Sequence, residues 1–334
     1  MSTNPPSKKI LFASYFQEPT FESETRRQAR ERLGQILPLE PYSQDKFTAE
    51  DAPGVVAVLA NSVYFSPEFY AAAEDLRAIS RWGVGFDKVN VDVATEHGVI
   101  VTVAPAHMDT VAEYAITQWL ATMKRVYTLN SASHQGDFDL RKTFDVQGST
   151  FGLYGLGRIG QQVAQRAKPM LGETGRLLVY DLRDDIHELA QQFGAEAVSD
   201  SDVLFEECDT ISLHVSGDTT IVGEDQLRKM KPHASLINPS RGNLVDDQAV
   251  HRAIEEEQLY YYVVDDPVSG PREIHRGHPR IICTNHNGGI TVESVSRLDS
   301  MVFSQITDVL QKRVPPHVLN TAVLEHPRVK SYFK

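Results

Sequence analysis

Three glycines and one aspartate carry the clearest chemical signal in this chain. Gly155, Gly157 and Gly160 follow the apolar run Phe151–Tyr154, and Asp181 stands at the end of a second apolar run. Such a turn lets the backbone approach a pyrophosphate closely, and the helix that follows presents free N–H groups and a positive dipole. The aspartate can accept both hydroxyls of an adenosine ribose and would repel a 2′-phosphate. The pattern therefore predicts NAD binding and disfavours NADP; the alternative is a glycine-rich turn without a ligand.

Two residues further along the chain could give a bound nicotinamide a reaction to catalyse. Arg241 follows the buried run Ser235–Asn238, and a guanidinium there can clamp a planar carboxylate with two hydrogen bonds. His286 directly follows the run Ile281–Thr284, and a neutral imidazole can take a proton from a hydroxyl and return it in the reverse direction. The alternatives are a surface arginine in a turn and a structural histidine at a strand end.

A third loop, Arg81–Asp87, could recognise an anion through its backbone. Gly83 and Gly85 expose N–H groups there, and such a loop can bind a carboxylate. The alternative is a bare turn that binds no ligand.

The elements that must position these residues alternate between short apolar runs and helical segments, which is typical of parallel α/β sheets. The first third of the chain predicts one sheet and the part after Phe151 predicts another, whose runs are apolar throughout and fit strands that are buried on both faces. Helical spacing marks 110–123 as the crossover into the cofactor domain and 294–310 as the return. The predicted strands are 10–13, 55–60, 78–82, 99–103, 151–154, 177–180, 210–214, 235–238, 261–264 and 281–284. The other predicted helices are 23–33, 66–76, 159–167, 187–193 and 247–256.

Length and composition limit the class of protein. A chain of 334 residues is expected to form two domains, and its net charge of −12 argues against nucleic acid or an anionic membrane as a partner. The two cysteines, Cys208 and Cys283, suggest a reducing compartment. The polar N-terminal segment lacks the apolar core of a signal peptide, and no apolar run reaches membrane-spanning length. We therefore expect a cytoplasmic protein.

Taken together, these segments resemble the D-isomer-specific 2-hydroxyacid dehydrogenases from about Ile10 to Asn320. The matching segments are Arg81–Asp87, Gly98–Thr102 with Pro105, Val111–Glu113, the glycine motif with Asp181, Asn238–Gly242, and His286 with Gly288 and Gly289. The resemblance implies an NAD domain, residues 110–303, inserted into a flavodoxin-like substrate domain, residues 1–109 and 304–334. It also implies a homodimer formed through the NAD domains.

The resemblance assigns roles residue by residue. Arg241 would bind the carboxylate of a small 2-hydroxy or 2-oxo acid, His286 would be the acid/base, and Val84 and Gly85 would supply backbone donors to the substrate. Arg158 and Ile159 would cover the pyrophosphate, Thr110 would lie near the phosphates and Asp265 near the nicotinamide amide. The further residues expected to contact the cofactor are His214, Val215, Ser216, Thr220, Asn238 and Gly288.

The chain departs from the family at the partner of the histidine. The family places a glutamate before a proline in the loop after Asp265, whereas this chain has Gly270 before Pro271. A carboxylate there orients the ring and stabilises imidazolium, so without it reduction of a 2-oxo acid should weaken near neutrality. Three replacements are open: Glu273, which we favour, Asp266, or a group of the substrate itself.

Polar residues at the predicted loop tips hint at the substrate. Asn61, Ser62 and Tyr64, with His107 and Asn285, suggest a polar pocket for a substrate larger or more hydroxylated than lactate, although loop tips are commonly polar.

Two other functions stay open. The same scaffold could serve as an NAD(H)-binding corepressor or regulatory protein, or as a dehydrogenase of an unusual donor such as formate or phosphite. A zinc site at His275, His278, Cys283 and His286 is disfavoured, because Cys283 would have to leave a buried strand. We predict no metal.

Overall fold

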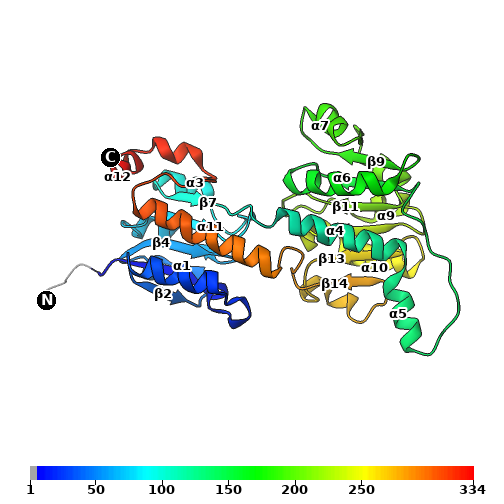
Figure 1. The fold of residues 1–334 in the computed structure, drawn as a ribbon, viewed down its shortest axis with the longest axis horizontal. Helices are drawn as coiled ribbons and strands as arrows, with labels where there is room; N and C mark the ends of the chain where they lie inside the picture. Colours follow the sequence, from blue (N-terminus) through cyan, green and yellow to red (C-terminus); the bar gives the residue numbers. More distant parts are fainter. Residues whose placement is uncertain (1–5) are drawn as a thin grey trace. The chain divides into compact units, whose positions relative to one another are not determined.

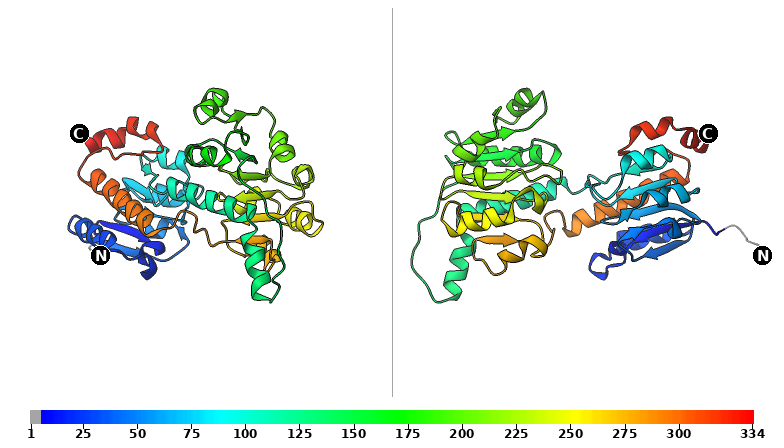
Figure 2. Two further views of the ribbon diagram at one scale, coloured as in Figure 1. Left: turned by 45° about the vertical axis from the view of Figure 1, so that its right-hand side comes forward. Right: turned by 180° about the vertical axis from the view of Figure 1, so that it is seen from behind.

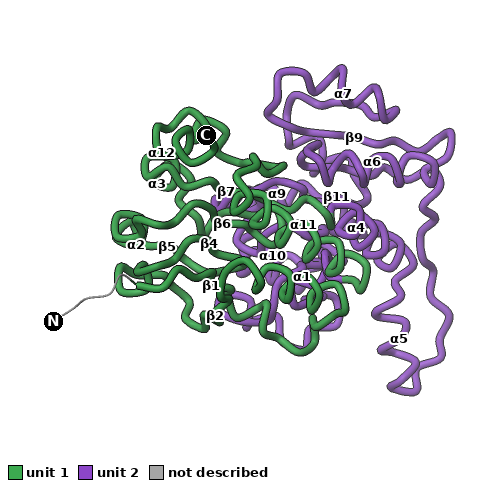
Figure 3. Tube along the Cα trace, turned by 60° about the vertical axis from the view of Figure 1, so that its left-hand side comes forward, with its two compact units in different colours: residues 1–107, 291–334 green, residues 108–290 purple. Residues whose placement is uncertain are grey.

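The computed structural model describes residues 6–334 and divides them into two compact units. Unit 1 comprises the chain up to His107 together with Thr291–Lys334, and unit 2 comprises Met108–Ile290 (Figure 3). Unit 1 is therefore discontinuous in sequence. Among the described residues, no helix is long and apolar enough to cross a membrane.

Unit 1 is built on a five-stranded parallel sheet with the order β2-β1-β4-β6-β7, of which β2, β4 and β7 are labelled in Figure 1. Counted within this sheet, the order is second, first, third, fourth, fifth, which is the flavodoxin-like arrangement. A separate pair, β3 and β5, lies beside it. The strands are β1 (Lys9–Ala13), β2 (Leu39–Tyr42), β3 (Lys46–Phe47), β4 (Val55–Ala60), β5 (Tyr64–Phe65), β6 (Ala78–Arg81) and β7 (Ile100–Thr102). The helices are α1 (Glu24–Gly34), α2 (Pro67–Ala72), α3 (Val91–Glu96), α11 (Val292–Leu310) and α12 (Pro327–Phe333).

Unit 2 is built on a seven-stranded parallel sheet with the order β10-β9-β8-β11-β12-β13-β14. The order reverses between β8 and β11, as in dinucleotide-binding sheets. The strands are β8 (Thr150–Tyr154), β9 (Arg176–Tyr180), β10 (Glu196–Ala197), β11 (Thr210–Leu213), β12 (Ser235–Asn238), β13 (Tyr261–Val264) and β14 (Ile281–Cys283). The helices are α4 (Met108–Met123), α5 (Val126–His134), α6 (Arg158–Leu171), α7 (Ile186–Gln192), α8 (Asp202–Glu207), α9 (Glu224–Lys229) and α10 (Asp247–Glu255).

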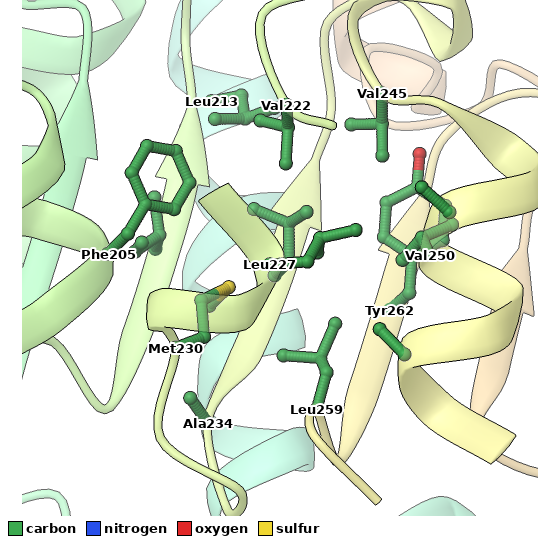
Figure 4. Packing of buried hydrophobic residues seen from close by; sticks show 14 of the residues in the cluster. Phe205, Leu213, Val222, Leu227, Met230, Ala234, Val245, Val250, Leu259 and Tyr262 are labelled. Carbon is green, nitrogen blue, oxygen red and sulfur yellow. The ribbon is translucent and has the colours of Figure 1, made fainter. Parts of the chain in front are cut away.

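Both faces of the unit 2 sheet are covered by helices. On one face Leu213 and Tyr262 pack against side chains of α8, α9 and α10, including Phe205 and Leu227 (Figure 4). On the other face Phe151 and neighbouring strand residues pack under helices α4 and α6. Successive strand residues alternate between two apolar faces, which explains why the strands appeared in the sequence as continuous apolar runs. The predicted fold class, two parallel-sheet domains with one inserted into the other, is confirmed.

The second boundary between the units lies at 290/291 rather than at the expected 303/304, and the first lies at 107/108 rather than at 109/110. Helix α11 belongs to unit 1 over its whole length because its side chains bond to α1 and to the sheet of that unit. Asp299 receives two hydrogen bonds from the fully buried Arg26, each 2.9 Å long, and Gln305 accepts hydrogen bonds from Ser80 and Thr102.

Candidate active site

The predicted site residues of unit 2 gather at one edge of its sheet. Every strand is parallel, so the segments that follow the strands all emerge at the carboxyl edge, where open α/β sheets bind ligands. These residues, each placed after the strand named, are Gly155 (β8), Asp181 (β9), His214 (β11), Arg241 (β12), Asp265 (β13) and His286 (β14).

The glycine turn after β8 is shaped by close backbone approach. Gly155 has a φ of 104°, and a Cβ there would lie 2.7 Å from the carbonyl oxygen of His214. A Cβ on Gly160 would lie 2.2 Å from the carbonyl oxygen of Gly155, so only glycine allows the helix to start here. Gly157 is the N-cap of α6, without a side-chain cap and with open space around it. The N–H groups of the first helical turn therefore remain available for a pyrophosphate.

Asp181 is held at the same turn. One carboxylate oxygen accepts a hydrogen bond from the Leu156 N–H at 2.6 Å, and the other accepts one from the Arg183 N–H at 3.2 Å. The half-buried carboxylate keeps lone pairs for ribose hydroxyls, so turn and acid together fit a dinucleotide. Arg158 is exposed and Ile159 half-buried at the start of α6.

The segment after β11 lies against the glycine turn. A Cβ on Gly155 would lie 2.8 Å from a methyl group of Val215. The His214 ring bonds to Ser212 at 2.9 Å, and burial lowers the pKa of His214 to about 3, so this imidazole stays neutral. Ser216 and Thr220 are exposed. The predicted Thr110 is buried in the first turn of α4.

The turn that carries Arg241 is closed by its own side chains. Asn238 donates to the Arg241 carbonyl at 2.7 Å and accepts from the Ser240 N–H at 3.1 Å, so its amide shapes the turn. Ser240 ties the turn to β11 through the Leu213 carbonyl at 2.8 Å. The half-buried Arg241 therefore stands on a turn with a defined backbone.

Asp265 holds the loop that presents His286. Its buried carboxylate accepts hydrogen bonds from the Thr284 hydroxyl at 2.6 Å, the Asn287 N–H at 2.8 Å and the Gly288 N–H at 2.6 Å. His286 has a φ of 58°, a left-handed conformation that is strained for a residue with a side chain. A Cβ on Gly288 would lie 2.7 Å from the Asp265 carboxylate. The clamp thus imposes the backbone conformation that points the exposed histidine outward.

The structure does not pair His286 with the carboxylates considered for it. Glu273, which we had favoured, forms an ion pair with Arg276 at 2.7 Å within one turn of 3-10 helix. The Asp266 carboxylate binds Arg272 at 2.9 Å. Within residues 6–334 His286 makes no hydrogen bond or ion pair. At Gly270, where the family has a glutamate, the backbone is in the left-handed region with a φ of 57°. This conformation favours glycine over a residue with a side chain.

In unit 1 the loop after β6 is closed by hydrogen bonds to its own backbone. Arg81 donates two hydrogen bonds to the Gly85 carbonyl, at 2.9 and 2.7 Å, and Gly83 has a φ of 118°. The N–H groups of Val84 and Gly85 have no acceptor within the described residues. Trp82 anchors the loop by donating to Asp299 at 2.8 Å.

The segment after β4 carries the predicted polar residues Asn61, Ser62 and Tyr64. Asn61 is half-buried, Ser62 is exposed, and the exposed Tyr64 ring lies 4.2 Å from the Lys88 ammonium. Their side chains thus lie at the surface after β4.

Sequence reasoning missed a network of charged residues behind Arg241. Asp247, Arg272 and His275 form it together with Asp266, and the first three are largely buried. The signal was weak, because charged residues in the loop Asp265–Arg280 look like ordinary surface residues. No group of three or more metal-ligating side chains occurs in the part of the chain that the structure describes.

The comparison with known families decides the identity of this arrangement. A sequence model described as "D-isomer specific 2-hydroxyacid dehydrogenase, NAD binding domain" matches residues 116–288. The chain belongs to the D-isomer specific 2-hydroxyacid dehydrogenase family. It is an NAD-dependent oxidoreductase, and its glycine turn and Asp181 fit that cofactor.

Relatives with similar sequences, and a solved structure with the same fold, are named as enzymes of this kind. The chain is 31% identical over 292 residues to a glyoxylate reductase of Korarchaeum cryptofilum, covering 83% of this chain and 85% of that one. It is 30% identical over 301 residues to a D-3-phosphoglycerate dehydrogenase of Methanocaldococcus jannaschii, covering 87% of this chain but 56% of that enzyme. A solved glyoxylate reductase from Paecilomyes thermophila shares the fold, with a TM-score of 0.79, 23% identity, and 94% and 98% of the two chains covered.

Proposed function

We propose that this dehydrogenase interconverts a D-2-hydroxy acid and the corresponding 2-oxo acid, with Arg241 binding the substrate carboxylate and His286 acting as acid/base. The observation that carries the proposal is the placement of both residues at the carboxyl edge of the NAD-binding sheet, after β12 and β14. When bound, the nicotinamide supplies or accepts the hydride at C2 of the substrate.

Arg241 would act by charge and shape. A guanidinium can hold a carboxylate with two parallel hydrogen bonds, and it can polarise the adjacent 2-oxo group. The turn formed by Asn238 and Ser240 restricts the backbone of Arg241, which lowers the entropy lost when substrate binds.

His286 would move the proton. During reduction, imidazolium donates a proton to the oxygen on C2; during oxidation, the neutral ring accepts that proton from the hydroxyl. Within residues 6–334 the favoured partner Glu273 binds Arg276 instead, so the backbone clamp of Asp265 would have to orient the ring.

Unit 1 would contribute anion recognition through the N–H groups of Val84 and Gly85. Arg81 fixes the carbonyl of Gly85, and the two N–H groups have no acceptor within the described residues. Asn61, Ser62 and Tyr64 add polar groups after β4, which supports a substrate that carries further hydroxyl or charged groups.

The test is a panel of 2-oxo acids with NADH. We expect Arg241→Ala to lower kcat/KM by about a hundredfold or more, as removal of one partner of a desolvated charge pair does. Arg241→Lys keeps the positive charge but cannot form two parallel hydrogen bonds to a carboxylate. It should therefore be more active than Arg241→Ala but less active than the wild type. Equal turnover by wild type and Arg241→Ala would exclude the proposed role.

A second candidate rests on the absence, within residues 6–334, of a hydrogen-bond or ion-pair partner for His286. A protein that binds NAD(H) to signal rather than to catalyse would not need an acid partner for this residue. Tight NADH binding without turnover of any 2-oxo acid, together with capture of a specific protein partner, would favour that candidate. An unusual hydride donor such as formate or phosphite is tested separately, by measuring the reduction of NAD⁺ in the presence of that donor.

We also propose that the protein is a cytoplasmic homodimer that pairs through unit 2. Helix α5 and the segment after it project from unit 2 (Figures 1 and 2), and Phe138 and Leu140 there are 80% and 102% exposed. Large exposed apolar side chains favour an interface. Both cysteines are free thiols, which supports a reducing compartment. Sedimentation of the wild type as a dimer and of the double variant Phe138→Ser, Leu140→Ser as a monomer would support the dimer contact; the same mass for both proteins would refute it.

A further inference from the structure

A network of charged side chains lies directly behind the turn of Arg241. The N–H of Gly242 donates to the Asp266 carboxylate at 3.2 Å, and the same oxygen is 2.9 Å from the Arg272 guanidinium. A second Arg272 nitrogen lies 3.5 Å from Asp247, whose other oxygen is bonded to His275 at 2.9 Å. The network therefore begins at the residue next to Arg241 and continues to the first turn of α10.

Burial makes this network more than a surface ion pair. The side chains of Arg272, Asp247 and His275 are 13%, 6% and 0% exposed, and Asp266 is 25% exposed. All three guanidinium nitrogens of Arg272 have partners, because its Nε donates to the Pro267 carbonyl at 3.3 Å. Groups so little exposed must keep their partners, so the network holds a defined geometry.

The absence of a side chain at Gly242 is a second sign that the ion pair lies against the arginine turn. A Cβ at this position would lie 2.1 Å from one terminal nitrogen of Arg272 and 2.6 Å from the Asp266 carboxylate. The φ of Gly242 is not in the left-handed region, so conformational freedom does not explain the glycine. Its missing side chain is what lets the ion pair lie against the backbone beside Arg241.

We propose that the Asp266–Arg272 pair is a positioning device for Arg241, and that it sets how well the enzyme recognises the substrate carboxylate. This inference rests on the proposed role of Arg241. By binding the Gly242 N–H, the pair fixes the peptide that joins Arg241 to Gly242. A guanidinium on a fixed backbone loses less freedom when it forms its two bonds to a carboxylate.

The altered loop after β13 thereby has a function of its own. The segment Asp265–Arg276 lacks the acid expected at Gly270, and its Asp266 and Arg272 face the arginine turn instead. The Asp266–Arg272 pair of this loop thus supports carboxylate binding rather than the acid/base histidine.

The experiment compares Arg272→Gln, Arg272→Lys and Asp266→Asn with the control Arg252→Gln. Arg252 is a surface residue of α10, 54% exposed, whose nearest ion-pair partner is 3.8 Å away. For each variant we would measure kcat, KM and the NADH dissociation constant. The discriminating readout is the ratio of kcat/KM for a 2-oxo acid to that for its methyl ester, which lacks the charge that Arg241 recognises.

We expect Arg272→Gln and Asp266→Asn to raise KM for the acid about tenfold and to lower the acid-to-ester ratio by a similar factor. The NADH dissociation constant and the ester kinetics should stay within about threefold of wild type, and Arg272→Lys should recover part of the ratio. If Arg272→Gln does not fold, two milder variants replace it in the test. Arg272→Lys keeps the positive charge, and Asp266→Asn keeps the volume of the side chain.

Two failures are distinguishable. An unchanged acid-to-ester ratio in folded Arg272→Gln and Asp266→Asn, with Arg241→Ala defective, would overturn this inference alone and leave the network a structural role. A wild type whose kcat/KM is insensitive to Arg241→Ala would refute the proposed function itself.

Discussion

Replacing Asp265 by asparagine tests whether the geometry of the His286 loop controls catalysis. The carboxylate accepts three hydrogen bonds, from the Thr284 hydroxyl and from the N–H groups of Asn287 and Gly288. An asparagine offers one acceptor oxygen, so its NH₂ group must face at least one N–H donor of the loop. Hydrogen bonds to a charged group contribute ~1.5–3 kcal/mol each, so we expect the loop to lose ~3 kcal/mol or more of local stabilisation.

The loss should be felt at His286. Its left-handed backbone costs about 1–2 kcal/mol, which the clamp offsets. Without the clamp the loop relaxes, and displacement of a catalytic group by about 1 Å can lower the rate ~100-fold. We therefore expect Asp265→Asn to reduce kcat about a hundredfold while the protein stays folded.

The assay is steady-state oxidation of NADH with the best 2-oxo acid, combined with thermal unfolding. Thr284→Val is the matched control, because it removes one of the three hydrogen bonds and leaves both N–H bonds in place. We expect it to lower kcat by no more than about tenfold. If folded Asp265→Asn keeps kcat within threefold of wild type, the clamp does not position the histidine and the reasoning fails.

Three further changes test the cofactor, the altered loop and the pH dependence of stability. Asp181→Ser should lower the preference for NADH over NADPH at least tenfold in kcat/KM, since the carboxylate that repels a 2′-phosphate is gone; an unchanged preference would contradict that role. Gly270→Glu should fold, because no atom lies within 4 Å of the new Cβ, at a cost of ~1–2 kcal/mol for the left-handed backbone. If its carboxylate reaches His286, the pH profile of reduction extends to higher pH, and an unchanged profile would show that the loop no longer serves the histidine. Burial alone would raise the pKa of Asp209, but hydrogen bonds from Lys231, the Thr150 N–H and His233 leave it below the usual 3.8. Asp209 thus stabilises the fold above pH ~4 and loses this contribution as the pH falls through its lowered pKa. Asp209→Asn should therefore unfold at a lower temperature than wild type at pH 7, by an amount that shrinks below pH ~4, and a pH-independent difference would contradict this.

The sequence predicted most strands of both sheets because each is an apolar run between turn residues. Strands β4, β12 and β13 have the predicted bounds, and the others differ by a residue or so. The short edge strands β2 and β10 were missed, since edge strands are partly exposed and carry polar residues. The compact units divide before α11 rather than near its middle, because side-chain bonds to another part of the chain decide which unit that helix joins.

The sequence by itself determined the cofactor, the family and the segments that carry Arg241 and His286. These follow from glycine spacing and from residues placed after apolar runs, which are local properties of the chain. Only the tertiary structure decided which charged groups meet. Glu273 and Asp266 are both close to His286 in sequence, yet they bind Arg276 and Arg272. The reason is physical: a carboxylate pairs with whichever cation the folded loop brings within about 3 Å, and that distance depends on how the 3-10 helix Gly270–His275 packs against α10.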